Sequence, residues 1–166
     1  MIRYFEILKL VANQNNKIYN VTNQSLCQIL FGKISYLFTP IFILLGISAN
    51  IITLFSFVSS ILMGVFIIIG HDFFFYVGIG LYFLCRILDY SDGAIARYHN
   101  NSTFYGRYID GLADIFLNSF LLFSISIYSD QIFNQLFLII FGCLAAILTT
   151  FDSFIYDRYS ALIRWS

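Results

Sequence analysis

Apolar residues follow one another almost without interruption from Tyr36 to Ile69. One helical membrane crossing needs about 20 residues, and this stretch is longer, so it must contain a break. The segment Gly46-Ile-Ser-Ala-Asn50 supplies one, because glycine often ends a helix and serine or asparagine often begins one. We therefore predict two elements here, an interfacial amphipathic helix at 33–46 and a first transmembrane helix at about 50–69.

The low charge content of the chain excludes a water-soluble fold. Only 11% of the residues are charged and 60% are hydrophobic, whereas soluble domains carry about a quarter charged residues. The apolar segments lack the alternating pattern of a membrane β-barrel, so the chain must cross the lipid as helices. The predicted fold is an all-α integral membrane protein with about four transmembrane helices, the later three at about 73–97, 106–128 and 132–150.

The N-terminal segment differs from the remainder in polarity. It is too polar to cross a membrane, so we expect residues 1–35 to form a cytoplasmic or interfacial lead and residues 36–166 to form the membrane domain. Under the predicted topology all nine Lys and Arg residues lie on one side of the membrane. The positive-inside rule makes that side cytoplasmic, so we expect a multi-pass protein of the cell membrane.

Four aspartates interrupt the apolar pattern near the end of the second predicted membrane helix and near the start of the third. Asp89 and Asp92 are three residues apart, and Asp110 and Asp114 are four apart, so each pair shares one face of a helix. The two helices are expected to run antiparallel and to bring all four carboxylates together at the cytoplasmic end. Carboxylates are costly beside hydrocarbon unless a cation holds them, and hard oxygen ligands suit Mg²⁺ or Mn²⁺ rather than zinc or copper.

The residues around the first acidic pair point to a phosphate ligand. Gly93 and Ala96 are small, which leaves room for a ligand or a neighbouring helix to approach closely. Arg97 offers a planar fork that suits a phosphate group. Arg86 precedes Asp89 by one helical turn, where it can either pair with that carboxylate or extend towards the membrane surface.

The pattern Asp-x2-Asp-Gly-x2-Ala-Arg-x8-Gly-x3-Asp-x3-Asp, from Asp89 to Asp114, resembles the signature of the CDP-alcohol phosphotransferases, the class I CDP-alcohol phosphatidyltransferases. Every specified position of that signature is matched. The resemblance implies a membrane enzyme of phospholipid biosynthesis that transfers a phosphate-linked alcohol group from a CDP-alcohol to a second alcohol and releases CMP. The chain is then a shortened form of the family's six-helix bundle.

The resemblance also implies roles for individual residues. The four aspartates would hold two divalent ions, Mg²⁺ or Mn²⁺, and Asp114 would also be the general base on the acceptor hydroxyl. Asn50 and Thr53 match a Pro-Asn-x-x-Thr stretch of the family, although Ala49 replaces the proline, and a simple helix cap explains them equally well. The full set of substrate-binding residues implied in this way is Gly93, Ala96, Arg97, Thr103, Gly106, Asn50 and Thr53.

The resemblance and the composition also predict the substrates and partners of the protein. We expect CDP-diacylglycerol as the donor, since an interfacial helix suits a lipid, together with a small alcohol as the acceptor. A bundle with fewer helices than the family would expose polar walls to membrane lipid, so we also expect a homodimer. The net charge of zero gives no reason to expect binding to nucleic acid.

Two other functions are compatible with the sequence. The first is a catalytically incomplete family member that acts as a partner subunit. The second is a cation transporter, whose acidic residues would bind ions transiently during transport across the membrane. Transport sites tend to lie near the middle of the membrane on broken helices, whereas these aspartates are expected at the cytoplasmic end of continuous ones.

Overall fold

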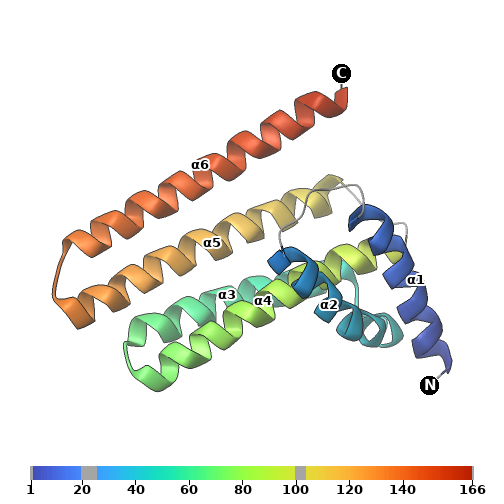
Figure 1. Ribbon diagram of the computed structural model, residues 1–166, viewed down its shortest axis with the longest axis horizontal. Helices are drawn as coiled ribbons and strands as arrows, with labels where there is room; N and C mark the ends of the chain where they lie inside the picture. Colours follow the sequence, from blue (N-terminus) through green and yellow to red (C-terminus); the bar gives the residue numbers. More distant parts are fainter. Residues whose placement is uncertain (1, 20–25, 100–103, 166) are drawn as a thin grey trace. The chain divides into compact units, whose positions relative to one another are not determined.

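The described part of the chain is entirely helical in its regular elements (Figure 1). The structure is a computed structural model that describes the backbone of residues 2–19, 26–99 and 104–165, with side chains described at 3–13, 29–99, 106, 108–152 and 155. This confirms the predicted all-α class. The helices are α1 (Ile2–Tyr19), α2 (Leu26–Leu44), α3 (Ala49–Ile69), α4 (Asp72–Tyr98), α5 (Phe104–Phe133) and α6 (Phe137–Trp165).

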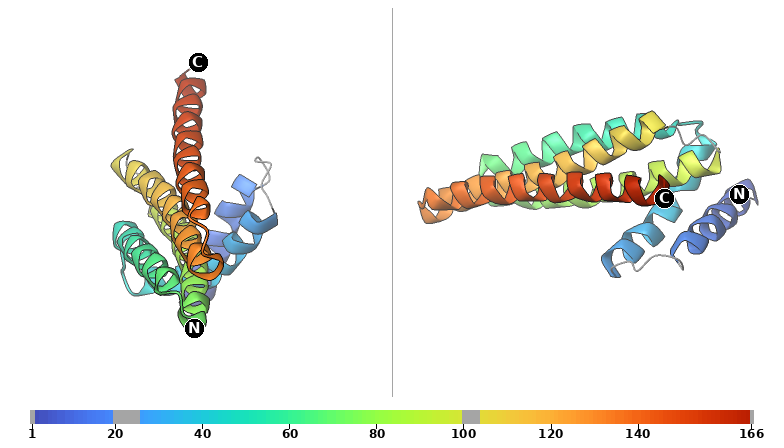
Figure 2. Two further views of the ribbon diagram at one scale, coloured as in Figure 1. Left: turned by 90° about the vertical axis from the view of Figure 1, so that its left-hand side faces the viewer. Right: turned by 90° about the horizontal axis from the view of Figure 1, so that it is seen from above.

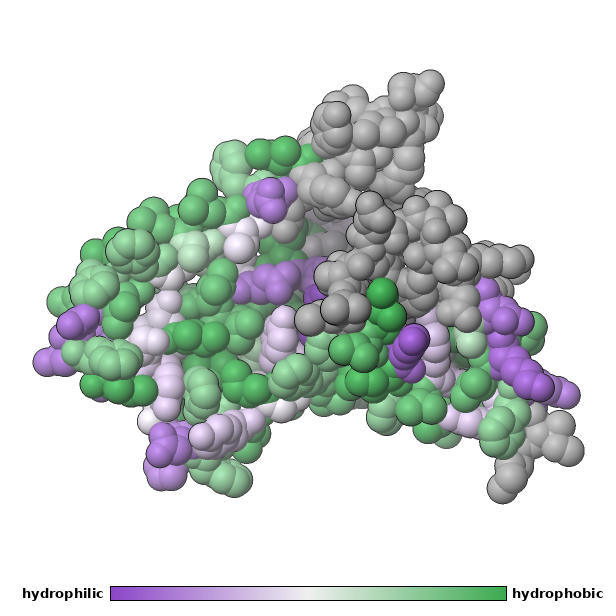
Figure 3. All heavy atoms as spheres, in the orientation of Figure 1, coloured by the Kyte–Doolittle hydropathy of each residue, from purple (hydrophilic) through white to green (hydrophobic). Residues whose placement is uncertain are grey.

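Three of the described helical segments are long and apolar enough to cross a membrane, namely α3, α4 and the Tyr108–Phe133 part of α5. Shorter apolar segments cover Ile29–Leu44 in α2 and Phe137–Asp152 in α6. Large apolar side chains are widely exposed, and Figure 3 shows them over much of the visible face. Such a surface is stable against lipid rather than water, so the chain is a multi-pass membrane protein.

The break between α2 and α3 lies where the sequence predicts it. Gly46 adopts a left-handed φ of 69°, and the amides of Gly46 and Ile47 donate to the carbonyls of Ile43 and Phe42 at 3.1 and 3.0 Å. This Schellman arrangement ends α2 and satisfies its last carbonyl groups. Helix α3 then begins at Ala49, directly after the break.

The predicted end of the third membrane helix is wrong. The predicted helices at 106–128 and 132–150 leave the polar pair Ser129 and Asp130 as the turn between them, but α5 continues to Phe133 and the turn follows at Asn134, whose φ is 52°. The Ser129 hydroxyl donates to the carbonyl of Ile125 at 2.8 Å, and a serine that bonds in this way is compatible with a helix interior. Asparagine tolerates the left-handed region better than most residues. Helix α6 consequently begins at Phe137 rather than at residue 132.

The chain divides into two compact units, each of which contains parts of several helices. Unit 1 comprises Met1–Phe57 and Phe83–Asp110, and unit 2 comprises Val58–Tyr82 and Gly111–Ser166. The long helices α3, α4 and α5 each contribute a segment to both units. The predicted N-terminal lead over residues 1–35 contains α1 and the beginning of α2.

In unit 1, α1 packs along α2 (Figure 2). The contact is built on a buried apolar cluster of Ile7 and Val11 from α1, Tyr36 from α2 and Ala94 from α4. Val11 and Ala94 are only 1% and 2% exposed. The N-terminal helix is thereby joined to the part of α4 that carries the signature residues.

In unit 2, glycines allow helices to approach one another closely. A Cβ atom added to Gly64 of α3 would collide with the side chains of Phe120 and Ser124 of α5. One added to Gly142 of α6 would collide with the side chain of Ser126. Helices in lipid associate largely through such close contacts between small residues and their neighbours. Between them, α5 and α6 also line an open, largely apolar concavity of about 350 Å³.

Candidate metal centre

Three of the predicted metal-ligand carboxylates come together in unit 1. Asp89 and Asp92 lie one turn apart on α4, and Asp110 lies in the second turn of α5. One carboxylate oxygen from each of the three lies within 4.8 Å of the other two. Asp92 is 4% exposed, and the other two are partly buried. Because Asp89 and Asp92 are three residues apart on α4, their carboxylates lie on one face of that helix. Helix α5 contributes the third carboxylate, that of Asp110.

The chemistry of these donors fits a divalent cation. All three offer oxygen atoms, and hard cations such as Mg²⁺ and Mn²⁺ prefer oxygen ligands. Like charges at this separation repel one another strongly in a partly buried site. Arg86 pairs with Asp89, with 3.8 Å between Nη1 and Oδ2, and its guanidinium also lies 5.8 Å from the ring centre of Tyr90. A partly exposed pair of this kind contributes little, whereas a divalent cation would neutralise the clustered carboxylates directly.

Thr53 contacts the acidic cluster from α3. Its hydroxyl donates to Oδ2 of Asp92 at 2.5 Å, and its Oγ1 also lies 3.1 Å from the carbonyl oxygen of Ala49. Thr53 is 8% exposed, so both partners of the bond to Asp92 are buried. The sequence predicts Thr53 as a substrate contact, but it contains no indication of this bond, which depends on how α3 packs against α4.

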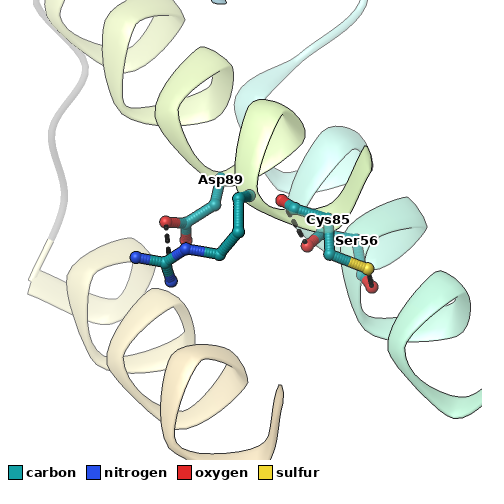
Figure 4. A network of polar contacts seen from close by, with 4 residues as sticks. Ser56, Cys85 and Asp89 are labelled. Carbon is teal, nitrogen blue, oxygen red and sulfur yellow. Dashed lines mark hydrogen bonds and ion pairs between the residues drawn. The ribbon is translucent and has the colours of Figure 1, made fainter. Parts of the chain in front are cut away.

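A second contact joins the same two helices one turn further along α3. The Ser56 hydroxyl donates to the carbonyl of Cys85 at 3.3 Å, and the Cys85 thiol donates to the carbonyl of Ser56 at 3.4 Å. Figure 4 shows this reciprocal pair beside Asp89, which follows Cys85 by one turn. Sequence reasoning missed both residues. The available signal was the spacing of Thr53, Ser56 and Ser60, which places three buried polar residues along one face of an apolar helix.

We refer to Asp89, Asp92 and Asp110 as the triad. The remaining predicted site residues of α4 and α5 lie close to this triad in sequence. A Cβ atom at Gly93 would lie 3.3 Å from Nη1 of Arg97, so the guanidinium lies against the glycine. Arg97 is exposed and Ala96 is partly buried. Gly106 is partly buried in the first turn of α5.

Two further predicted residues, Asn50 and Asp114, are described but are not members of the cluster of Asp89, Asp92 and Asp110. Asn50 is exposed in the first turn of α3. Asp114 is partly buried one turn after Asp110 on α5, belongs to unit 2 and is not among the three clustered carboxylates. Thr103 lies outside the described residues. The roles assigned to all of these residues stay predictions.

The fold and the site together define a helical, multi-pass membrane protein with a partly buried cluster of carboxylates suited to a divalent cation. The sequence model of the CDP-alcohol phosphatidyltransferase family matches residues 46–164, and the chain belongs to this family. No curated protein gives a significant match to it. Membership makes the protein part of a transferase family whose reaction uses a CDP-alcohol donor and an alcohol acceptor. Helices α1 and α2 both precede the matched region.

Proposed function

We propose that the protein is a divalent-metal-dependent phosphatidyltransferase that transfers the phosphatidyl group of CDP-diacylglycerol to a small alcohol and releases CMP, in phospholipid biosynthesis. The observation that carries this proposal is the convergence of Asp89, Asp92 and Asp110 within 4.8 Å. These carboxylates belong to the signature segment of a family that uses CDP-alcohols. An acidic cluster of this kind suits the handling of a diphosphate, which needs cations near it.

Four aspartates form the metal-binding part of the proposal. Asp89, Asp92 and Asp110, together with Asp114, would hold two Mg²⁺ or Mn²⁺ ions. Such ions supply charge neutralisation on the diphosphate and on the departing CMP. The partly buried setting strengthens every electrostatic interaction in the site relative to water.

The protein's own residues would position and deprotonate the reactants. Asp114 accepts the proton of the acceptor hydroxyl as its oxygen forms a bond to the phosphatidyl phosphorus. The bond from that phosphorus to the CMP oxygen breaks, and CMP leaves. A carboxylate is a weak base at neutral pH, so most of the acceleration must come from positioning and electrostatic stabilisation.

The donor-binding part of the site would lie at the end of α4 and the start of α5. The guanidinium of Arg97 suits the diphosphate, and the small residues beside it leave space for the CDP group. The other proposed donor contacts are Gly93, Ala96, Thr103, Gly106, Asn50 and Thr53. The donor's lipid chains would remain in the membrane.

The orientation of the protein follows from its basic residues. The positive-inside rule applied to the nine Lys and Arg residues would place the site at the cytoplasmic face of the cell membrane. CDP-linked substrates and Mg²⁺ are available there. We further propose that the chain functions as a homodimer, in which a second copy covers polar surface that lipid would leave unsatisfied.

The experiment that tests this function is CMP release by purified protein in liposomes. The assay contains CDP-diacylglycerol, Mn²⁺ or Mg²⁺ and a mixed pool of small alcohols. We expect metal-dependent CMP release that requires an alcohol and is abolished by Asp114→Asn. A matched control is Asp130→Asn, which makes the same change near the other end of α5 and should keep activity. Wild-type turnover by Asp114→Asn would refute the assignment of the base.

The same assay separates the alternatives. A partner subunit would bind a CDP donor but release CMP only when its missing partner is added. A transporter would move Mn²⁺ into sealed liposomes without any CDP donor. The continuity of α4 through Asp89 and Asp92 supports the enzyme over the transporter, because transport sites usually lie on broken helices.

A further inference from the structure

We propose that Thr53 is a positioning residue that holds the Asp92 carboxylate in one orientation for divalent metal binding. This inference rests on the proposed function, because it assigns Asp92 to the metal. It changes the role of Thr53 from a contact with substrate to a residue that acts through a metal ligand.

The hydrogen bond between the two side chains has a defined direction. A threonine hydroxyl carries a single hydrogen, and Oγ1 of Thr53 lies 2.5 Å from Oδ2 of Asp92 and 3.1 Å from the carbonyl of Ala49. Bonds to ionised acceptors are shorter and stronger than bonds to neutral ones. When Asp92 is ionised, as a ligand to a cation must be, the hydrogen goes to Asp92 rather than to the Ala49 carbonyl.

The position of the hydroxyl is determined by the helix that carries it. The branched Cβ of threonine restricts its side chain to few rotamers in a helix. The reciprocal Ser56 and Cys85 contact, one turn further along α3, holds α3 against α4. Both Thr53 and Asp92 are less than a tenth exposed, so water cannot easily replace either partner. The donor thus stands at a fixed point beside the carboxylate.

A fixed donor matters because the terminal torsion of an aspartate is otherwise broad. A bond to Oδ2 restricts that torsion and still leaves lone pairs on the carboxylate for a cation. Groups that orient metal ligands in this way typically contribute about 10-fold to 100-fold to metal affinity or activity. Ser56 lacks this role, because its hydroxyl bonds to a backbone carbonyl rather than to a carboxylate of the triad.

The test compares Mn²⁺ binding by purified protein in detergent, measured by electron paramagnetic resonance of free Mn²⁺. The variants are Thr53→Val, which removes the hydroxyl at similar volume, Thr53→Ser, which keeps it, and Ser56→Ala, which removes the neighbouring hydroxyl. We expect Thr53→Val to weaken Mn²⁺ binding about 10-fold to 100-fold. Thr53→Ser should bind Mn²⁺ as the wild type does. Ser56→Ala keeps the carbonyl that accepts from the Cys85 thiol, so it should weaken Mn²⁺ binding much less than Thr53→Val.

A kinetic measurement distinguishes positioning from a merely structural effect. In Thr53→Val the Mn²⁺ concentration needed for half-maximal CMP release should rise in proportion to the loss of binding, whereas KM for CDP-diacylglycerol should stay unchanged. An increased KM for the donor at saturating Mn²⁺ would instead restore Thr53 as a direct substrate contact and overturn the proposal.

The remaining outcomes are equally decisive. Wild-type Mn²⁺ affinity in Thr53→Val overturns the role of Thr53 and leaves the metal centre intact. An equal loss in Ser56→Ala would assign the effect to packing of α3 against α4 and overturn the proposal as well. If the wild-type protein binds no Mn²⁺ and releases no CMP, the proposed function fails and this inference fails with it.

Discussion

The guanidinium of Arg97 lies against Gly93, so that a Cβ atom on the glycine would be 3.3 Å from Nη1 and 3.7 Å from Nη2. The two residues are four apart on α4, which places them on the same face one turn from each other. The missing side chain at position 93 therefore determines where the arginine head group can rest. Both residues are proposed contacts of the CDP donor.

Gly93→Ala should weaken binding of the donor. A methyl group at this position is closer to the guanidinium than ordinary contact distance, so Arg97 must move away from its present position. We expect KM for CDP-diacylglycerol to rise several-fold with little change in Mn²⁺ affinity. The matched control is Gly80→Ala on the same helix, where an added Cβ meets nothing within 4 Å. An unchanged KM in Gly93→Ala would contradict the proposed contact.

Metal should stabilise the protein through the aspartate triad. A ligand that binds only the folded state at 100 times its dissociation constant contributes about 2.7 kcal/mol. We expect Mn²⁺ to raise the Tm of the wild type and EDTA to reverse the effect, whereas Asp110→Asn should show little response. The Tm of each protein, with Mn²⁺ and with EDTA, is measured by thermal unfolding followed by tryptophan fluorescence or by circular dichroism.

The same experiment also tests whether Asp110→Asn raises or lowers the stability of the metal-free protein. Without metal, the three carboxylates repel one another, so Asp110→Asn should be at least as stable as the wild type in EDTA. Asp130→Asn on the same helix serves as the control and should keep the response to Mn²⁺. A wild type whose Tm is unaffected by Mn²⁺ would argue against a metal centre at the triad.

The N-terminal helix α1 should dock through its buried apolar face. Val11 is 1% exposed, and Val11→Ala removes two methyl groups from the cluster with Tyr36 and Ala94. At about 0.8 kcal/mol for each buried group of this size, the local loss is about 1–2 kcal/mol. This corresponds to about 5-fold to 30-fold faster hydrogen exchange for the amides of α1.

Leu10 provides the comparison for Val11. It precedes Val11 on α1 but is 54% exposed, so Leu10→Ala removes apolar atoms without disturbing the cluster. Hydrogen exchange measured by mass spectrometry in detergent should leave α1 unchanged in that variant. Equal acceleration in both variants would show that α1 is not held by the face described here.

Sequence patterns predicted the apolar helices best where hydropathy and helix breakers agree. Gly46 predicted the break before α3, and the predicted first and second membrane helices begin and end within one residue of α3 and α4. The pattern failed at Ser129 and Asp130, because a polar pair does not end a helix when the serine bonds within it. Asn134 carries the actual turn.

The sequence by itself determined the all-α membrane class and the family, because composition and a spaced signature are properties of the chain alone. It also placed Asp89 and Asp92 on one helix face, since that follows from three-residue spacing. Only the tertiary structure decided that Asp110 joins them within 4.8 Å, that Thr53 donates to Asp92 and that Ser56 pairs with Cys85. These contacts depend on the rotation and depth of one helix against another, and periodicity within a single helix does not specify either.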